Sequence, residues 1–356
     1  MKKILLTVGL CFFFAQLAHA KDALLFGTTF SAKQCAYLGL DWKQTYLKIL
    51  DLPLDVIRLG AYWDQIEEKE GKFDFLDLDW QIEQAGLREI TVILSVGMKA
   101  PRWPEYHFPS WVKERVKPGF GSIVSTNEFL RQKTLQFTEK VVRRYRDNPS
   151  VKYWQIENEA LNRFGGKQWR LQEKFLEEEI ALVRRIDPQD RPIILTAASY
   201  PNNFLRVLSK IFTNTKPIRE NLKLADILGI NVYPMIGHRG WGRNWYFGSR
   251  RNARLNHLKE IFDMAQKSGK DIWITELQAE PWEPGHLAYT KKDTPPTGWP
   301  QTTEQTLEEL HRIGYKTFLF WGAEFWYYQQ KKFNNPTWWD AIDAMITKYK
   351  RQTLHR

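Results

Sequence analysis

The chain is poor in cysteine. Its 356 residues include two cysteines, Cys11 and Cys35. Cys11 lies in an N-terminal segment that we expect to be removed, which would leave Cys35 alone. A single cysteine excludes an internal disulfide and a cysteine-based metal site. An exported protein without disulfides depends on a large hydrophobic core, so the chain favours one large domain.

The chain also lacks an apolar run long enough for a membrane span. The run from Ile4 to Phe14 is shorter than the ~20 residues that a bilayer requires. It follows Lys2 and Lys3 and precedes Ala18-His19-Ala20. This order predicts a secretory signal peptide over residues 1–20, cleaved to leave a domain over residues 21–356. An uncleaved membrane anchor is the alternative. We therefore expect an exported protein, periplasmic or extracellular, without stable membrane insertion.

Charge of one sign is not gathered into a long tract. The formal net charge is +11, and removal of Lys2 and Lys3 would leave 11 − 2 = +9. Basic residues are interleaved with acidic ones, so a nucleic-acid footprint is not expected. The excess gives at most a weak attraction to acidic surfaces or anionic polysaccharide.

Several motifs of cofactor-dependent and serine enzymes are missing. No Gly-x-Gly-x-x-Gly opens a helix after the first expected strand, and no Gly-x-Ser-x-Gly elbow is present. His107 and His238 fall in expected loops and could touch a substrate, but neither belongs to a His-Glu-x-x-His sequence. We therefore expect neither a metal nor an organic cofactor.

Aromatic residues, in contrast, are abundant. Phe, Trp and Tyr make up 14% of the chain, with 16 tryptophans. Most must contribute to the core, since large aromatic side chains carry much of the burial energy. Exposed ones would suit the flat faces of sugar rings. Six tryptophans fall in expected loops: Trp103, Trp111, Trp241, Trp245, Trp282 and Trp326.

Short β-branched runs alternate with longer amphipathic segments, which is the pattern of repeated βα units. Near-continuous apolar runs are typical of strands buried on both faces of a parallel sheet. We interpret the chain as an α/β protein with a single closed (β/α)8 barrel, and a doubly wound open sheet is the alternative. Eight strands are expected, at residues 24–29, 56–60, 90–97, 151–158, 193–198, 227–232, 271–276 and 317–321.

Amphipathic helices are expected between several of these strands. They cover residues 128–146, 169–186, 255–267 and 303–311. The longest loops are expected at residues 98–126, 233–250 and 278–302, after the third, sixth and seventh strands. In a parallel barrel all three emerge at the carboxyl ends of the strands, where active sites lie.

Two glutamates close expected strands. Glu159 follows the fourth strand and Glu276 ends the seventh, so barrel geometry would place them across the mouth from each other. Retaining glycosidases need such a pair, one carboxyl group as acid and base and the other as nucleophile. Glu157 lies two residues before Glu159 and would share its side of a continuing strand. Spacing favours Glu159 and leaves Glu157 open as the acid.

The sequence resembles the glycoside hydrolases of clan A, in which an Asn-Glu pair ends strand 4 and a second glutamate ends strand 7. The local string Gln155 to Glu159 and the segment Glu67 to Phe75 are most similar to β-galactosidase members. The resemblance extends over the mature chain through Val56-Ile57-Arg58, Glu67 to Phe75, Asn158-Glu159, Asn231-Val232-Tyr233-Pro234, Thr275-Glu276 and Phe320-Trp321.

This resemblance implies a β-glycosidase that acts with retention on a carbohydrate substrate. It implies that Glu159 is the acid and base and that Glu276 is the nucleophile. Four further residues acquire substrate-binding roles by the same resemblance. These are Asn158 on the sugar hydroxyl beside the reacting carbon, Tyr233 and Arg58 on the nucleophile, and Trp321 as the floor beneath the sugar.

Other interpretations remain open at this stage. Glu280 and Glu324 follow the last two strands and could line the cleft. The barrel could bind glycans without cleaving them, or could act on phosphorylated metabolites as an isomerase or lyase. Within the clan, the choice between a β-galactosidase-like exo-enzyme and an endo-β-glycanase depends on loop shape.

Overall fold

The computed structural model describes residues 24–163, 167–199, 217–240, 243–248, 250–283, 285, 287–290 and 292–354. Within these residues eight parallel strands close into a barrel in the order β1-β2-β3-β4-β5-β6-β9-β10. The expected barrel is therefore confirmed, and the open-sheet alternative is wrong. The barrel strands are β1 (Leu25–Phe30), β2 (Val56–Gly60), β3 (Thr91–Val96), β4 (Val151–Ile156), β5 (Ile193–Ser199), β6 (Ile227–Val232), β9 (Asp271–Gln278) and β10 (Thr317–Trp321).

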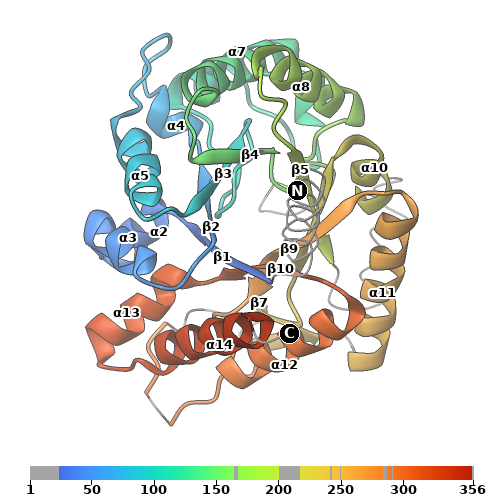
Figure 1. Cartoon of the computed structure of the whole chain (residues 1–356). Helices are drawn as coiled ribbons and strands as arrows, with labels where there is room; N and C mark the ends of the chain where they lie inside the picture. The colour runs from blue at the N-terminus through green and yellow to red at the C-terminus, as the bar shows by residue number, and fades with distance from the viewer. Residues whose placement is uncertain are drawn as a thin grey trace, which may run out of the picture.

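Helices surround the barrel as an outer ring, which the view in Figure 1 shows end on. They bury apolar stripes against the outward faces of the strands, and this layer forms the larger hydrophobic cluster. The helices are α2 (Ala32–Leu38), α3 (Trp42–Leu50), α4 (Trp63–Ile66), α5 (Leu76–Gly86), α6 (Ser110–Arg115), α7 (Glu128–Tyr145), α8 (Glu173–Ile186), α10 (Pro217–Leu224), α11 (Arg251–Lys267), α12 (Pro300–Ile313), α13 (Ala323–Phe333) and α14 (Thr337–Leu354), with a short 3-10 turn, η1 (Val124–Thr126).

Two boundaries differ from the sequence prediction in a way that affects the site. Strand β4 ends at Ile156, so Glu157 and Glu159 both lie beyond it rather than at its end. Strand β9 continues to Gln278, two residues past Glu276.

Helix α8 begins at Glu173 rather than Trp169, because the preceding residues extend along the β3 and β4 loops. There the backbone N–H of Leu171 donates to the Ala160 carbonyl oxygen.

A second, smaller cluster fills the amino-terminal part of the barrel interior. Val56 belongs to it, and Arg58 lies two residues further along β2. Because side chains two apart on a strand share a face, Arg58 also points inward, above this apolar plug. The cluster consists of Val56, Ile93, Ile194, Ile227, Trp273 and Leu319, with Tyr153 packed against it.

The expected loop at residues 233–250 contains an antiparallel hairpin that the sequence analysis missed. Its strands are β7 (Met235–Gly240) and β8 (Arg243–Gly248). The hairpin follows β6 and therefore rises from the carboxyl-terminal face of the barrel. It was overlooked because glycines and arginines interrupt the usual alternation of strand residues.

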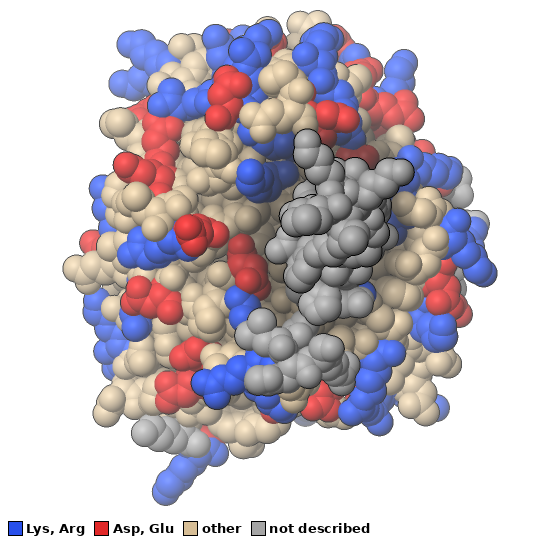
Figure 2. Space-filling view, in the orientation of Figure 1, with Lys and Arg blue, Asp and Glu red and all other residues tan. Residues whose placement is uncertain are grey.

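Lysine and arginine side chains are interspersed with acidic ones over the face shown in Figure 2. No helix in the described part of the chain combines the length and the apolar character needed to cross a bilayer. The expected signal peptide, with Cys11, and Trp241 lie outside the described residues.

Candidate active site

Glu276 lies inside the barrel mouth on β9, where two donors bind its carboxylate. The guanidinium of Arg58 donates from Nη2 to Oε1 over 2.6 Å, and the phenol of Tyr233 donates to Oε2 over 2.5 Å. Arg58 is fully buried and Glu276 nearly so. A buried cation and a hydroxyl donor both stabilise the negatively charged form of a carboxyl group.

An irregularity in β9 gives Glu276 this direction. Its register against β6 shifts between the pairs Ile230↔Ile274 and Asn231↔Glu276, so Thr275 is an extra residue. Trp273 packs in the barrel interior, and strict alternation would point the side chain three residues later outward. The β-bulge resets the alternation and turns Glu276 inward.

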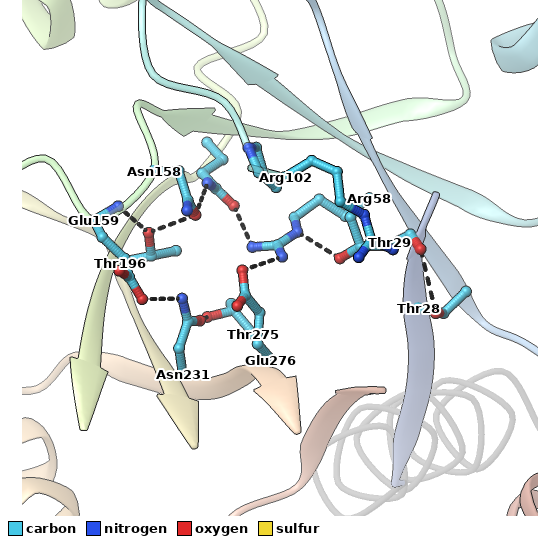
Figure 3. Close-up of polar contacts among 12 residues, drawn as sticks. Thr28, Thr29, Arg58, Arg102, Asn158, Glu159, Thr196, Asn231, Thr275 and Glu276 are labelled. Atoms are coloured by element: carbon cyan, nitrogen blue, oxygen red, sulfur yellow. Dashed lines mark hydrogen bonds and ion pairs between the residues drawn. The ribbon is translucent and has the colours of Figure 1, made fainter. Parts of the chain in front are cut away.

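Arg58 is itself held in place from two other strands. Its Nε donates to Thr29 Oγ1 over 2.8 Å, and its Nη1 donates to Gln155 Oε1 over 3.1 Å. Figure 3 shows the guanidinium directed at Glu276, with a dashed line to Thr29 as well. The arginine therefore has one fixed orientation, although β1, β2, β4 and β9 are separated widely in the sequence.

Glu159 faces the same space from the loop after β4. Its Oε1 accepts from Asn231 Nδ2 over 2.6 Å, and its backbone N–H donates to Thr196 Oγ1 over 2.9 Å. The pKa of this carboxyl is raised to about 8, first by burial and then by the negative charges of Glu105 and Glu276. Glu159 is therefore a buried carboxylic acid that keeps its proton near neutral pH.

The structure removes Glu157 from the site. Its carboxylate accepts from the backbone N–H groups of Met98 and Lys99 over 2.9 and 2.5 Å. Glu157 and Glu159 both have positive φ, 56° and 46°, so the chain does not continue as a strand here. The condition for a shared side, a strand that continues to Glu159, is therefore not met, and Glu157 holds the β3 loop.

Asn158 lies between these two glutamates and is also buried. Its Oδ1 accepts from Gln155 Nε2 and from Thr196 Oγ1, each over 3.3 Å. Both bonds use the amide oxygen, which fixes the orientation of the carboxamide.

Asn231 on β6 is a site residue to which the sequence analysis gave no role. It donates to Glu159 through Nδ2 and accepts from Thr275 Oγ1 through Oδ1, over 2.6 and 2.7 Å. Figure 3 shows its carboxamide between the two acidic residues. The motif Asn231-Val232-Tyr233-Pro234 was visible in the sequence, but the direction of Asn231 depends on how β6 pairs with β9.

Lys99 and Glu105, in the loop after β3, form a second unexpected group beside Glu159. The ammonium of Lys99 is fully buried and donates to the backbone oxygen of Glu159 over 2.9 Å. The same nitrogen lies 2.9 Å from Glu105 Oε2. One buried cation therefore fixes the backbone of Glu159 and the carboxylate of Glu105 close together.

Trp321 ends β10, and two arginine guanidinium groups lie near its ring. The Arg102 guanidinium carbon is 4.2 Å from its ring centroid, and that of Arg58 is 5.9 Å away. Arg102 was not anticipated, and it also binds both secondary candidates. It is 2.5 Å from Glu324 Oε2 and 3.5 Å from Glu280 Oε1. The two glutamates therefore belong to a buried ion cluster that supports Arg102 against Trp321.

The remaining candidates are spread more widely. His107 is buried against Tyr62, its Nε2 lies 3.2 Å from the Arg102 carbonyl oxygen, and burial lowers its pKa to about 3. It therefore orders the β3 loop as a neutral side chain. His238 is exposed on β7.

Among the expected loop tryptophans, Trp326 is fully buried in α13, which corrects its placement. Trp111 is partly buried, and Trp103, Trp245 and Trp282 are exposed.

The site thus contains two buried carboxyl groups in different surroundings. One is buried near two other acidic groups and holds a proton, and the other is bound by an arginine and a phenol. Such a pair can donate a proton to a leaving oxygen on one side and supply a nucleophilic oxygen on the other. The described residues contain no cluster of three or more His, Cys, Asp or Glu side chains suited to a metal ion.

Comparison with known proteins gives a partial sequence match. The model of the glycoside hydrolase 42 family, described as β-galactosidase, matches residues 40–178. The β-galactosidase Bga of Halorubrum lacusprofundi is 28% identical over 127 residues, which are 33% of this chain and 18% of that protein. The β-galactosidase BbgII of Bifidobacterium bifidum is 32% identical over 121 residues, 31% of this chain and 18% of that protein. These matches therefore span less than a fifth of the curated relatives.

Solved structures extend the likeness of the fold to the whole barrel. Gan42B, a β-galactosidase of glycoside hydrolase family 42, has a TM-score of 0.63 and 15% identity, over 93% of this chain and 57% of that one. Xylanase 10B of Thermotoga maritima has a TM-score of 0.56 and 16% identity, over 94% of this chain and 97% of that one. The chain is therefore similar in sequence to glycoside hydrolase family 42 over residues 40–178, which include Asn158 and Glu159, and similar in fold to these glycoside hydrolase barrels.

Proposed function

We propose that the protein hydrolyses β-glycosidic bonds with retention of configuration, with Glu159 as acid and base and Glu276 as nucleophile. The observation that carries this proposal is the contrast between the two carboxyl groups. Glu159 has a pKa raised to about 8, whereas Glu276 accepts hydrogen bonds from Arg58 and Tyr233. A retaining mechanism requires a protonated and an ionised carboxyl group about 5 to 5.5 Å apart.

In the first step, a carboxylate oxygen of Glu276 forms a bond to the anomeric carbon. The bond from that carbon to the leaving oxygen breaks, and Glu159 gives its proton to this oxygen. In the second step, Glu159 takes a proton from water, the water oxygen attacks the same carbon, and the ester bond to Glu276 breaks. Both carboxyl groups return to their starting states.

The structure also supports a proton cycle between the steps. The charge of Glu276 is one of the causes that raise the pKa of Glu159. This charge disappears when Glu276 becomes an ester, so the pKa of Glu159 falls when it must act as a base. Asn158 would donate to the hydroxyl next to the reacting carbon, and Trp321 would pack against the sugar ring.

The curated relatives are β-galactosidases, so β-galactosides are the first substrates to test, together with β-glucosides, β-mannosides and β-xylosides. Soluble β-glycans should be assayed in parallel for new reducing ends, which separates action at chain ends from internal cleavage. NMR of the first-formed product should show the β-anomer. An α-anomer would contradict the assignment of Glu276 as nucleophile.

Substitution of the two glutamates tests their roles. Glu276→Ala should abolish turnover, with activity reduced at least about 10⁴-fold, because no nucleophile remains. Glu159→Ala should retain the first step for substrates with very good leaving groups, which need little protonation. Circular dichroism and thermal melts should confirm that both variants fold. Full activity of Glu276→Ala, or equal losses of Glu159→Ala on all leaving groups, would contradict these roles.

We also infer that the protein is exported, because residues 1–20 have the basic, apolar and Ala-x-Ala order of a signal peptide. N-terminal sequencing of protein from the cell envelope and the medium should give Lys21 as the first residue. A chain that retains Met1 would contradict cleavage.

A further inference from the structure

The hairpin β7–β8 and the neighbouring Trp282 present an aromatic surface beside the proposed site. Trp245, Phe247 and Trp282 are 46%, 36% and 40% exposed. Large aromatic side chains are seldom left exposed without a function, and a cluster of them next to a site often marks a binding surface. They come from the loops after β6 and β9, which both rise from the carboxyl-terminal face.

Pairing of the hairpin places two of these rings on one face. Residues directly opposite in an antiparallel pair share a face. Ile236↔Phe247, His238↔Trp245 and Gly240↔Arg243 are such pairs, so Phe247, Trp245 and Arg243 follow one another along one face. Tyr246 and Arg239 lie on the other face.

Trp282 joins the face of Phe247 and Trp245. The segment that contains Trp282 runs beside β7, where the Gly237 N–H donates to the Trp282 carbonyl oxygen over 3.0 Å. The next residue, Glu283, accepts from the Tyr246 hydroxyl over 2.6 Å, on the opposite face of the hairpin. Successive side chains of an extended segment point to opposite sides, so Trp282 lies on the Phe247 side.

The same tryptophan connects the hairpin to the proposed nucleophile. Its ring stacks on Tyr233 with centroids 4.7 Å apart and planes 27° apart. The hydroxyl of Tyr233 in turn donates to Glu276 over 2.5 Å. A sugar chain that leaves the reacting position over Tyr233 would therefore meet Trp282 and then the hairpin.

The hairpin lies in a segment of positive charge. Residues 227–259 contain no Asp or Glu but five arginines and one lysine. Arg251 and Arg254 pair with Glu309. Arg239 and Arg243 are exposed and have no carboxylate within ion-pair distance among the described residues.

We propose that this face, Trp282, Phe247, Trp245 and Arg243, binds an acidic β-glycan whose sugar rings carry carboxylates. The aromatic rings would pack against the sugar faces, and the planar guanidinium of Arg243 matches the two oxygens of a carboxylate. The proposal rests on the proposed function, since it takes the surface as an extension of that site.

Binding to an inactive variant tests the surface separately from catalysis. In Glu276→Gln, isothermal titration with β-1,4-linked mannuronate oligosaccharides should show binding that weakens as salt rises, because exposed charge pairs are screened. Addition of Arg243→Gln should weaken it roughly three- to tenfold. Arg239→Gln, on the other face of the same hairpin, and the double variant Arg88→Gln with Arg351→Gln, at exposed positions elsewhere, should change it less than twofold.

The aromatic residues should affect binding regardless of charge. Trp282→Ala and the double variant Trp245→Ala with Phe247→Ala should weaken both acidic and neutral β-glycan oligosaccharides by roughly tenfold. The proposal would be overturned if neutral β-1,4-galactan bound as tightly as the acidic β-glycan. Tighter binding of dextran sulfate, or equally tight binding of DNA or anionic phospholipid vesicles, would overturn it too. Absence of glycan binding would overturn it as well, whereas a failure of the catalytic roles would appear as lost turnover of small chromogenic glycosides.

Discussion

Glu105 is the residue whose charge contributes most, after burial, to the raised pKa of Glu159. The charged groups around Glu159 are Glu105 and Glu276, which raise its pKa, and Lys99, which lowers it. Asn231 donates to the same carboxyl group. The β3 loop therefore adjusts an acid that lies on the β4 loop, although it contributes no group to the proposed reaction.

Substitution of Glu105 should shift the alkaline limb of activity. In the mechanism proposed here Glu159 must be protonated in the free enzyme, so kcat/KM should fall as pH rises through about 8. Glu105→Gln removes a negative charge and frees Lys99 from its ion pair. Both changes lower the pKa of Glu159, so the limb should move to lower pH.

The pH profile of kcat/KM on a glycoside with a poor leaving group measures this shift. Glu114→Gln, an exposed position on α6, is the matched control and should leave the limb unchanged. An unchanged limb in Glu105→Gln would refute the assigned influence of Glu105.

Some residues of the site could be predicted from the sequence, and others could not. Glu159 and Tyr233 lie just beyond strand ends, and Arg58 and Glu276 lie within two residues of the carboxyl ends of their strands, so a strand pattern and a family resemblance bring them together. Asn231 could not be given its contacts, because its partners are fixed by closure of the barrel and by the bulge in β9. Arg102, Lys99 and Glu105 lie in an irregular loop whose backbone no periodic pattern describes.

At the scale of elements, the contact between helix α8 and the end of β4 contains two facing acids. Glu179 is fully buried on α8, and burial and the charge of Glu157 raise its pKa well above its usual range. Burial also raises the pKa of Glu157 to about 7. Since the two carboxyl groups repel each other when both are ionised, the pair keeps at least one proton.

This pair should make stability decline with rising pH. A carboxyl group whose pKa is higher in the folded chain stabilises the fold below its unfolded pKa of about 4.3. The stabilisation is lost as pH rises through the folded value, about 7 for Glu157. Glu179→Gln removes the repulsion and supplies an amide donor to Glu157, so its melting temperature should fall less between pH 5 and pH 8.

Thermal melts of the two proteins across this range measure the difference, which should reach several degrees by pH 8. Glu177→Gln, at an exposed position on α8, is the control and should follow the unsubstituted protein. Parallel curves for all three proteins would exclude a shared proton at Glu157 and Glu179.

At the scale of the whole molecule, the only cysteine in the described part of the chain reports on global unfolding. Cys35 on α2 is fully buried, and burial raises the pKa of its thiol far above the usual range. The thiolate is the reactive form, so a buried thiol of raised pKa reacts slowly.

In a chain that begins at Lys21, an aromatic disulfide reagent should therefore label Cys35 only when the barrel opens. Labelling along a urea titration should coincide with the loss of far-ultraviolet circular dichroism. Rapid labelling without denaturant would show that α2 opens locally while the barrel stays closed.

The architecture as a whole was the most predictable property of this chain. Buried parallel strands must be nearly continuous apolar runs, and each run returns after a helix, so the number and order of strands follow from the sequence. The hairpin β7–β8 did not follow, because it lies on the surface and is held by Trp282 and Glu283 rather than by its own apolar pattern.

The double attachment of Asn231 has a mechanical consequence. One of its hydrogen bonds ends on Glu159 and the other on Thr275, next to Glu276. One carboxamide thus connects the loop that carries Glu159 to the strand that carries Glu276, so the spacing on which a retaining mechanism depends is set in part by a strand that carries neither acid.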